Sequence, residues 1–264
     1  METRIEGLVI SKVIYRERDL ICHLLLRNGK TVSVMFYGGR GGGKKMKPST
    51  LELGYMIKAQ LKNVRQTDST LYTASEWKTL WIHEKIRSNH NAFYLMCFYF
   101  ELLSRLATQD DLFDEHRDFD NSLEGIFKVT SNALFYLEES VDKNNFKIQT
   151  QLFFYLSRLI FELGIAPMDD YCLFCKKNLE VFQGINLAFE HGGFICFDCS
   201  GEKESNENIG KLLWRLLRGT RKFKYADYEK VKIVDKGINQ LLFDYLCYQF
   251  NFSRDSFKSR SFVF

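Results

Sequence analysis

The sequence lacks any long hydrophobic run. No apolar stretch reaches the roughly 18 residues that suggest a membrane span, and the opening METRIEGLVI lacks the apolar region of a signal peptide. With 264 residues, 45% of them hydrophobic and 15% aromatic, the chain can build a sizeable core in two or three domains. We therefore expect a folded, cytoplasmic protein that does not contact membranes.

Recognisable catalytic sets are missing as well. None of the five histidines has a glutamate two positions later, as zinc-dependent nucleobase deaminases require. No Ser/His/Asp set or carboxylate pair stands out, and a nuclease would need carboxylates around a metal, which we cannot locate. The sequence therefore indicates no active site, and we expect the chain not to be an enzyme.

Charge is spread unevenly along the chain. Residues 1–80 hold 14 Lys and Arg against 7 Asp and Glu, whereas residues 81–170 hold 8 against 15. The net charge of the whole chain is only +4. Ordinary surface variation is the alternative, but a swing of this size between neighbouring blocks favours separate domains, the first of which faces an anionic partner.

The segment FYGGRGGGKKMKPS contains a glycine-rich basic loop. Gly38 to Lys44 has the spacing of a phosphate-binding loop, but Lys45 stands where that motif needs Ser or Thr, and Pro48 disfavours a following helix. Two interpretations remain: a flexible surface loop, or a mobile arm that follows a nucleic-acid backbone, with glycines for close approach and cations for phosphates.

The first 80 residues predict β-structure. Asn28-Gly29 is a strong hairpin signal, and the strand-like runs are short and rich in β-branched residues. These runs are Ile5–Ile14, Leu20–Leu26, Lys30–Tyr37, Leu53–Val64 and Ser69–Trp77. Five strands in this length suit a Greek-key barrel of the oligonucleotide-binding (OB) type, with a small SH3-like barrel as the main rival. We predict an OB-type domain over residues 1–80.

From about residue 80 the hydrophobic period becomes helical. Expected helices cover Leu80–Ala107, Leu123–Leu137, Ile148–Leu163, Ile209–Leu217 and Ile238–Phe252. Gly164 followed by Pro167 is the expected stop of the third. The fold class is therefore α+β: an N-terminal five-stranded OB-type β-barrel, and a C-terminal α-helical domain over residues 81–264.

Four of the seven cysteines form two C-x₂-C pairs. Cys172 and Cys175 are followed, after 20 intervening residues, by Cys196 and Cys199. This spacing is typical of a structural zinc site, in which four thiolates close a tetrahedron. The alternatives are disulfides, which a cytoplasmic setting disfavours, or free buried thiols. We predict a four-cysteine zinc ribbon at about residues 170–202, embedded in the helical domain, with one structural Zn²⁺ per chain.

Together these segments resemble the RecO family of bacterial recombination mediators. The resemblance is carried by EGLVISKVIYRERDLI, FYGGRGGGKKMKPS, ELGIAPMDDYCLFC, HGGFICFDC and the ending FKSRSF, and it covers nearly the whole chain. It implies an OB barrel, a helical domain and an embedded zinc ribbon. It also implies binding of single- and double-stranded DNA, annealing of complementary strands, and work with RecR to load RecA onto DNA coated by the single-strand-binding protein. The cell location implied is the cytoplasm, in association with the nucleoid.

Candidate site residues follow from charge and from the resemblance. We expect one positive DNA-binding surface made of Arg16, Arg18, Arg40, Lys44, Lys45 and Lys47. Phe36 or Tyr37 is a candidate for base stacking, and strand alternation turns one of them inward. Arg158 beside Tyr155 is a candidate contact for the C-terminal tail of the single-strand-binding protein, the alternative being a core-edge arginine.

The sequence leaves open the role of a second basic cluster and an alternative function for the chain. A second basic cluster follows the cysteine region: Arg215, Arg218, Arg221, Lys222 and Lys224. It either extends the DNA path or solvates a helix end. The alternative function for the whole chain is a zinc-ribbon adaptor that binds protein partners and has no DNA affinity of its own.

Overall fold

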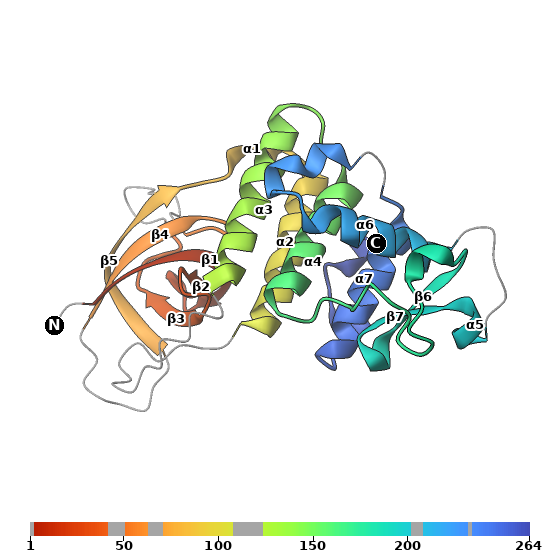
Figure 1. The fold of residues 1–264 in the computed structure, drawn as a ribbon. Helices are drawn as coiled ribbons and strands as arrows, with labels where there is room; N and C mark the ends of the chain where they lie inside the picture. Colours follow the sequence, from red (N-terminus) through yellow and green to blue (C-terminus); the bar gives the residue numbers. More distant parts are fainter. Residues whose placement is uncertain (1–2, 42–50, 63–70, 108–123, 202–207, 232–233) are drawn as a thin grey trace. The chain divides into compact units, whose positions relative to one another are not determined.

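The computed structural model describes residues 3–41, 51–62, 71–107, 124–201, 208–231 and 234–264. These residues form two compact units, Met1–Asp142 and Lys143–Phe264. The domain boundary expected from the sequence lies after residue 80, where strands give way to helices. In the structure the first unit also includes the helices up to Asp142. Both units appear in Figure 1, and each is described here by itself.

The first unit begins with a closed five-stranded barrel whose strand order is β1-β2-β3-β5-β4. Its strands are β1 (Thr3–Tyr15), β2 (Asp19–Leu26), β3 (Thr31–Phe36), β4 (Met56–Leu61) and β5 (Leu71–Trp81). β1 closes the barrel by pairing with both β2 and β4, and the β3–β5 pair is parallel. This is the Greek-key order of the OB fold, so the prediction of an OB-type barrel is confirmed.

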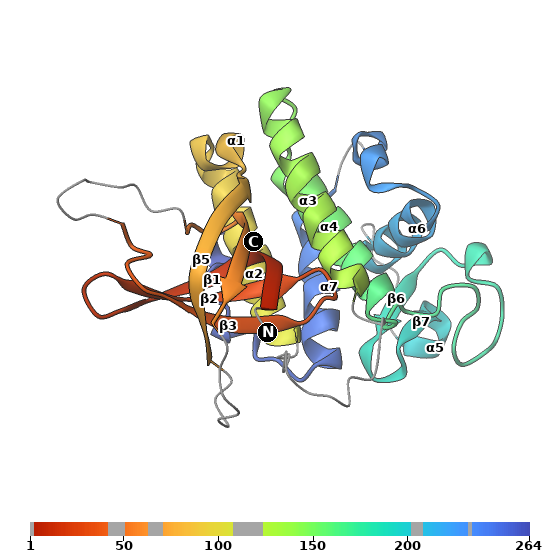
Figure 2. The ribbon, with the colours of Figure 1, turned by 90° about the vertical axis from the view of Figure 1, so that its left-hand side faces the viewer.

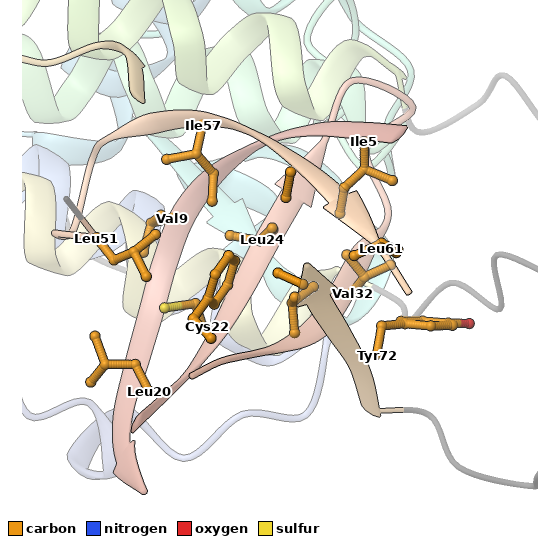
Figure 3. Close-up of a cluster of buried hydrophobic side chains, with 14 of the residues drawn as sticks. Ile5, Val9, Leu20, Cys22, Leu24, Val32, Leu51, Ile57, Leu61 and Tyr72 are labelled. Atoms are coloured by element: carbon orange, nitrogen blue, oxygen red, sulfur yellow. The ribbon is translucent and has the colours of Figure 1, made fainter. Parts of the chain in front are cut away.

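Alternating side chains of all five strands fill the barrel interior (Figure 3). Val9, Leu24 and Val34 have no exposed surface, and Ile57 and Leu61 close the core from β4. Burial of apolar surface contributes about 25 cal/mol per Å² to folding. This cluster is therefore the main stabilising contribution to the barrel. The Asn28-Gly29 signal is confirmed too, because Gly29 has a φ of 81° in the turn between β2 and β3.

Three helices complete the first unit: α1 (Glu84–Ser88), α2 (His90–Leu106) and α3 (Glu124–Asp142). The sequence predicted one helix from Leu80 to Ala107, but β5 continues to Trp81 and the helix is broken at Asn89. Asn89 is extended, and its side-chain oxygen accepts a hydrogen bond from the Ala92 N–H, which restarts the helix as α2. Arg87 links α1 to the barrel by donating to the Leu53 carbonyl oxygen at 2.7 Å.

In the described residues of the second unit, three longer helices pack on one another beside a small ribbon fold. The helices are α4 (Ile148–Glu162), α6 (Ile209–Arg221) and α7 (Lys236–Gln249), and α4 contacts both others. Gly164, with a φ of 68°, ends α4 as predicted. Between α4 and α6 lie β6 (Ile185–Ala188), β7 (Gly193–Cys196) and the short α5 (Phe197–Ser200). Within the described ranges, no helix has the length and apolar character needed to cross a membrane.

Candidate metal centre and nucleic-acid interface

The four paired cysteines converge on one point of the second unit. The sulfur atoms of Cys172, Cys175, Cys196 and Cys199 all lie within 4.8 Å of one another, and we call this set the four-cysteine cluster. The Sγ atoms of Cys175 and Cys196 are 3.8 Å apart. In a tetrahedral zinc site with Zn–S bonds of about 2.3 Å, neighbouring sulfur atoms are about 3.8 Å apart. The cluster therefore fits a metal ion that prefers thiolate ligands in tetrahedral geometry.

Backbone pairing brings the two cysteine knuckles together. β6 and β7 pair in register, and Gly192 makes their turn with a φ of 62°. The Leu173 N–H then donates to the Phe194 carbonyl oxygen at 3.1 Å, which attaches the first knuckle to β7. A Cβ on Gly193 would stand 3.0 Å from the Met168 carbonyl oxygen, so this close approach requires glycine. The predicted ribbon fold and its four-cysteine cluster are confirmed.

One thiol of the cluster has a lowered pKa, whereas burial raises the pKa of Cys196 to about 12 and the pKa of Cys199 is raised as well. Burial alone would raise the pKa of Cys172, but backbone N–H groups of Cys196, Cys175 and Phe174 together lower this pKa to about 6. The Cys196 N–H lies 3.4 Å from the Cys172 sulfur. Hydrogen bonds of this kind stabilise thiolates, the form in which cysteine binds metal. His191 is exposed and packs edge-on against Phe174, so it lies outside the sulfur cluster.

The predicted DNA-binding arginines that the structure describes meet at one end of the barrel. Arg16 and Arg18 lie in the turn between β1 and β2, and Arg40 follows β3. The Arg40 N–H donates to the Arg18 carbonyl oxygen at 3.1 Å, and the Arg40 side chain reaches the Glu17 carbonyl oxygen at 3.4 Å. All three guanidinium groups are on exposed residues and make no ion pair within the described chain.

An exposed aromatic side chain at the end of β3 lies close to a lysine at the end of β4. Tyr37 is 53% exposed at the end of β3, whereas its neighbour Phe36 is fully buried, as the alternation of strand side chains requires. The Lys62 Nζ stands 5.9 Å from the Tyr37 ring centre. Sequence reasoning did not select Lys62, although its place directly after β4 was a usable signal. We call Arg16, Arg18, Arg40, Tyr37 and Lys62 the cationic rim.

The turn that carries the rim is exposed and conformationally unusual. Val13, Ile14 and Tyr15 are all exposed, and the β1–β2 hairpin extends beyond the rest of the barrel (Figure 2). Arg16 has a φ of 57°, a left-handed conformation that is uncommon for residues other than glycine. Its guanidinium carbon lies 5.2 Å from the Tyr15 ring centre. The other three predicted DNA contacts, Lys44, Lys45 and Lys47, lie outside the described residues.

Arg158 and Tyr155 face the interior of the second unit. Tyr155 on α4 has no exposed surface, and Arg158 donates to the carbonyl oxygens of Thr220 and Phe223 at the end of α6. Burial lowers the pKa of Arg158, although the guanidinium stays charged. In this position Arg158 ties α4 to the C-terminal end of α6, whose last carbonyls favour a cation.

The second basic cluster is partly neutralised by acids of its own unit. Arg218 pairs with Glu180 at 2.8 Å, and Arg221 pairs with the buried Asp169 at 3.1 Å. Arg218 also lies over the Trp214 ring. These pairs hold α6 against the ribbon segment, so the cluster contributes to folding as well as to surface charge.

Comparisons with known proteins agree with the resemblance. No family model matches the chain. The matching curated relatives carry the name DNA repair protein RecO. The protein of Caldanaerobacter subterraneus subsp. tengcongensis is 23% identical over 234 residues, which cover 86% of this chain and 83% of the relative. That of Limosilactobacillus reuteri is 26% identical over 74% of this chain and 66% of the relative.

A third relative, from Syntrophomonas wolfei, is 28% identical over 85 residues, 31% of this chain and 32% of its own length. The two longer matches cover 86% and 74% of this chain, and all three relatives carry the same name. The OB barrel and the four-cysteine cluster agree with that name. The resemblance of this chain to the RecO family of DNA repair proteins is thereby confirmed.

Proposed function

We propose that the chain is a non-enzymatic mediator of recombination in DNA repair. It binds single- and double-stranded DNA, anneals complementary strands, and works with RecR to load RecA onto DNA covered by the single-strand-binding protein. The relatives' shared name supports the role in DNA repair. The cytoplasm, next to the nucleoid, is the corresponding location.

The cationic rim is the observation that carries the proposal. Arg16, Arg18 and Arg40 come from two chain segments, yet one backbone hydrogen bond and one from the Arg40 side chain hold those segments together. Because the three guanidinium groups are exposed and make no ion pair in the described chain, phosphates can replace their water and counterions. Such contacts carry no sequence information, which suits a protein that must act on any pair of complementary strands.

Annealing follows from the same electrostatics. Two DNA strands repel each other, and a surface that neutralises phosphates of both lowers that repulsion without reading bases. Exposed Tyr37 adds a stacking surface that tolerates every base. Lys44, Lys45 and Lys47, which follow Arg40 in the sequence, are proposed to extend the rim.

We propose Zn²⁺ as the metal of the four-cysteine cluster, one per chain. Four cysteine thiolates are a closed, soft donor set, and the 3.8 Å sulfur separation fits zinc. With all four positions taken by protein, the metal braces the ribbon and leaves no position for a reacting water. The ribbon residues themselves hold the knuckles in place through β7.

The partner assignments belong to the proposal as well. RecR and the C-terminal tail of the single-strand-binding protein are the partners that the resemblance implies. Arg158 and Tyr155 were predicted to meet that tail, but their inward position supports a structural role better. The chain's contact with the tail therefore stays a prediction without an assigned surface.

A fluorescence anisotropy titration of labelled oligonucleotides, repeated over a salt series, tests the function. We expect the logarithm of the affinity to fall linearly with the logarithm of salt concentration, and an annealing assay to show acceleration over protein-free strands. Replacing Lys44, Lys45 and Lys47 by Gln should weaken binding and flatten the salt slope. A zinc-ribbon adaptor without DNA affinity, the alternative, would give no salt-dependent binding and no annealing.

A further inference from the structure

We propose that a single DNA strand bound at the cationic rim continues onto the outer face of the barrel. It would lie in a shallow groove formed by β1, β4 and β5, with its phosphates on Arg4, Lys58 and Lys78. This inference rests on the proposed function and adds a second, unassigned part to the same nucleic-acid site.

The groove has a volume of about 300 Å³ and is lined by side chains of three neighbouring strands, mostly polar but with Ala59 and Trp77 among them. Strand pairing places Arg4 opposite Gln60 and Gln60 opposite Glu76. The adjacent row joins Lys58 to Lys78. Residues two apart on a strand lie about 7 Å from each other on the same face, so these side chains form one compact patch.

A continuous series of contacts links this patch to the rim. Lys62 follows Gln60 and Leu61 directly, and its Nζ reaches the Tyr37 ring at 5.9 Å. Gly38, next to Tyr37, donates its N–H to the Asp19 carboxylate at 2.9 Å, at the base of the β1–β2 turn. A strand that leaves the arginines of the turn therefore meets Tyr37 and Lys62 before it reaches Arg4.

Charge complementarity selects a polyanion as the occupant. Arg4 and Lys78 are exposed and have no ion-pair partner among the residues that the structure describes. Lys58 is held by Glu6 at 3.0 Å, and this bond, together with one from Arg27, lowers the pKa of Glu6. Glu76 is the acid that lines the groove itself, so the lining cations outnumber it.

The groove also indicates a single strand. It is shallow, and its cations lie on the outer surface of a curved barrel, so they can follow one flexible backbone. One OB barrel covers roughly 4 to 16 nucleotides. A short oligonucleotide is accommodated at the rim alone, whereas a longer one reaches the groove, and this difference in length distinguishes the two parts of the site.

The test is the double variant Arg4→Gln/Lys78→Gln, titrated with oligothymidylates of about 5 and about 20 nucleotides. For the longer oligonucleotide we expect a loss of roughly 10- to 30-fold in affinity at 0.1 M salt. The slope of log affinity against log salt should become shallower by about 1.4, because each single-strand phosphate contact contributes about 0.7. Affinity for the shorter oligonucleotide should stay unchanged.

Two further variants act as controls. Glu76→Gln removes the acid from the groove and should tighten binding of the longer oligonucleotide, an effect opposite to that of the double variant. Lys128→Gln/Lys236→Gln removes the same two charges from exposed positions on α3 and α7 and should leave both affinities unchanged. Glu76→Gln is expected to increase affinity, and a loss of stability would not produce such an increase. The inference can therefore be tested even where the double variant is less stable.

Three outcomes would overturn the inference. The longer oligonucleotide binds the double variant as tightly as it binds the wild type, or both lengths weaken equally, or annealing falls while the affinity for one strand is preserved. The last result would assign the groove to a second strand instead. Absence of salt-dependent binding by the wild-type chain would instead be a failure of the proposed function, which is a distinct observation.

Discussion

The backbone N–H of Arg40 donates to the carbonyl oxygen of Arg18 across 3.1 Å. This bond joins the chain after β3 to the turn between β1 and β2, two segments more than 20 residues apart in the sequence. It places Arg16, Arg18 and Arg40 at the same end of the barrel. The positive surface therefore depends on how the barrel closes as well as on the local basic composition.

Neutralising this set should reduce DNA affinity in a salt-dependent way. In the variant Arg16→Gln/Arg18→Gln/Arg40→Gln, three phosphate contacts are lost, so we expect the slope of log affinity against log salt to become shallower by about 2 for single-stranded DNA. Anisotropy titrations at four or more salt concentrations measure this slope. Glu17→Gln, in the same turn, should have the opposite effect, and an unchanged slope in the triple variant would exclude the rim.

The left-handed backbone conformation of Arg16 should lower the stability of the fold, while its side chain contributes to DNA binding. Its φ of 57° is a left-handed conformation that costs a residue other than glycine roughly 1–2 kcal/mol. The variant Arg16→Gly should therefore raise the free energy of unfolding by up to about 1 kcal/mol while weakening DNA binding. Chemical denaturation and anisotropy measure the two effects. A variant that loses both stability and affinity would show that Arg16 stabilises the turn itself.

Substitution of Phe36 should affect the stability of the fold, whereas substitution of its neighbour Tyr37 should affect DNA binding. Phe36 is buried in the barrel and meets Trp77 edge-on with ring centres 5.2 Å apart, so Phe36→Ala should cost about 3–5 kcal/mol in unfolding free energy. Tyr37 is exposed, so Tyr37→Ala should leave the melting temperature nearly unchanged. It should weaken single-strand binding by about 1–3 kcal/mol if a base stacks on the ring. Equal affinity of wild type and Tyr37→Ala would remove Tyr37 from the rim.

Much of this architecture was readable from the sequence because its signals are local. β-branched runs, the Asn28-Gly29 turn and the change to a helical period indicated the order of strands and helices. The cysteine spacing identified all four residues of the metal cluster, since each C-x₂-C pair forms one knuckle. The prediction of a single helix over Leu80–Ala107 was wrong, because apolar periodicity outweighed the capping side chain of Asn89.

The parts that could not be predicted depend on contacts between distant segments. The neighbours of Lys62 follow from barrel closure, and the groove beside Arg4 follows from the registers of β1, β4 and β5. Likewise, the sequence left Arg158 open between a partner contact and a core-edge position, and its partners are carbonyl oxygens at the end of α6. Periodicity identifies the side of a helix that is buried but does not show which groups it meets there.

His83 should make the first unit less stable as the pH falls. Its Nδ1 meets the carboxylate of Glu138, and its Nε2 is buried with no partner in the described chain. Burial lowers the pKa of His83 below its ordinary value of 6.5, although Glu138 opposes this shift. Below about pH 6.5 the unfolded chain therefore binds more protons than the folded one, and the free energy of unfolding decreases.

Denaturant unfolding of the wild type and of His83→Asn, measured from about pH 7.5 to about pH 5.5, about one unit on either side of the ordinary pKa, checks this prediction. The variant should lose part of the acid-side decrease. Glu138→Gln removes the opposing carboxylate and should steepen the decrease in the range where His83 titrates. Identical pH profiles for the wild type and His83→Asn would show that His83 keeps the same pKa in the folded and unfolded chains.

Loss of the metal from the four-cysteine cluster should unfold the ribbon. Cys172 and Cys196 are fully buried, and four thiolates this close together would repel one another, so a metal ion is the natural counter-charge for the cluster. We expect about one zinc per chain by elemental analysis. We also expect a large drop in melting temperature after treatment with a strong chelator, and the same drop, with loss of metal, in Cys172→Ser.

Cys97→Ser is the matched control, because Cys97 lies on α2 outside the cluster and its substitution should leave the metal content unchanged. A chain that holds no metal and melts at the same temperature with and without chelator would contradict the structural zinc site.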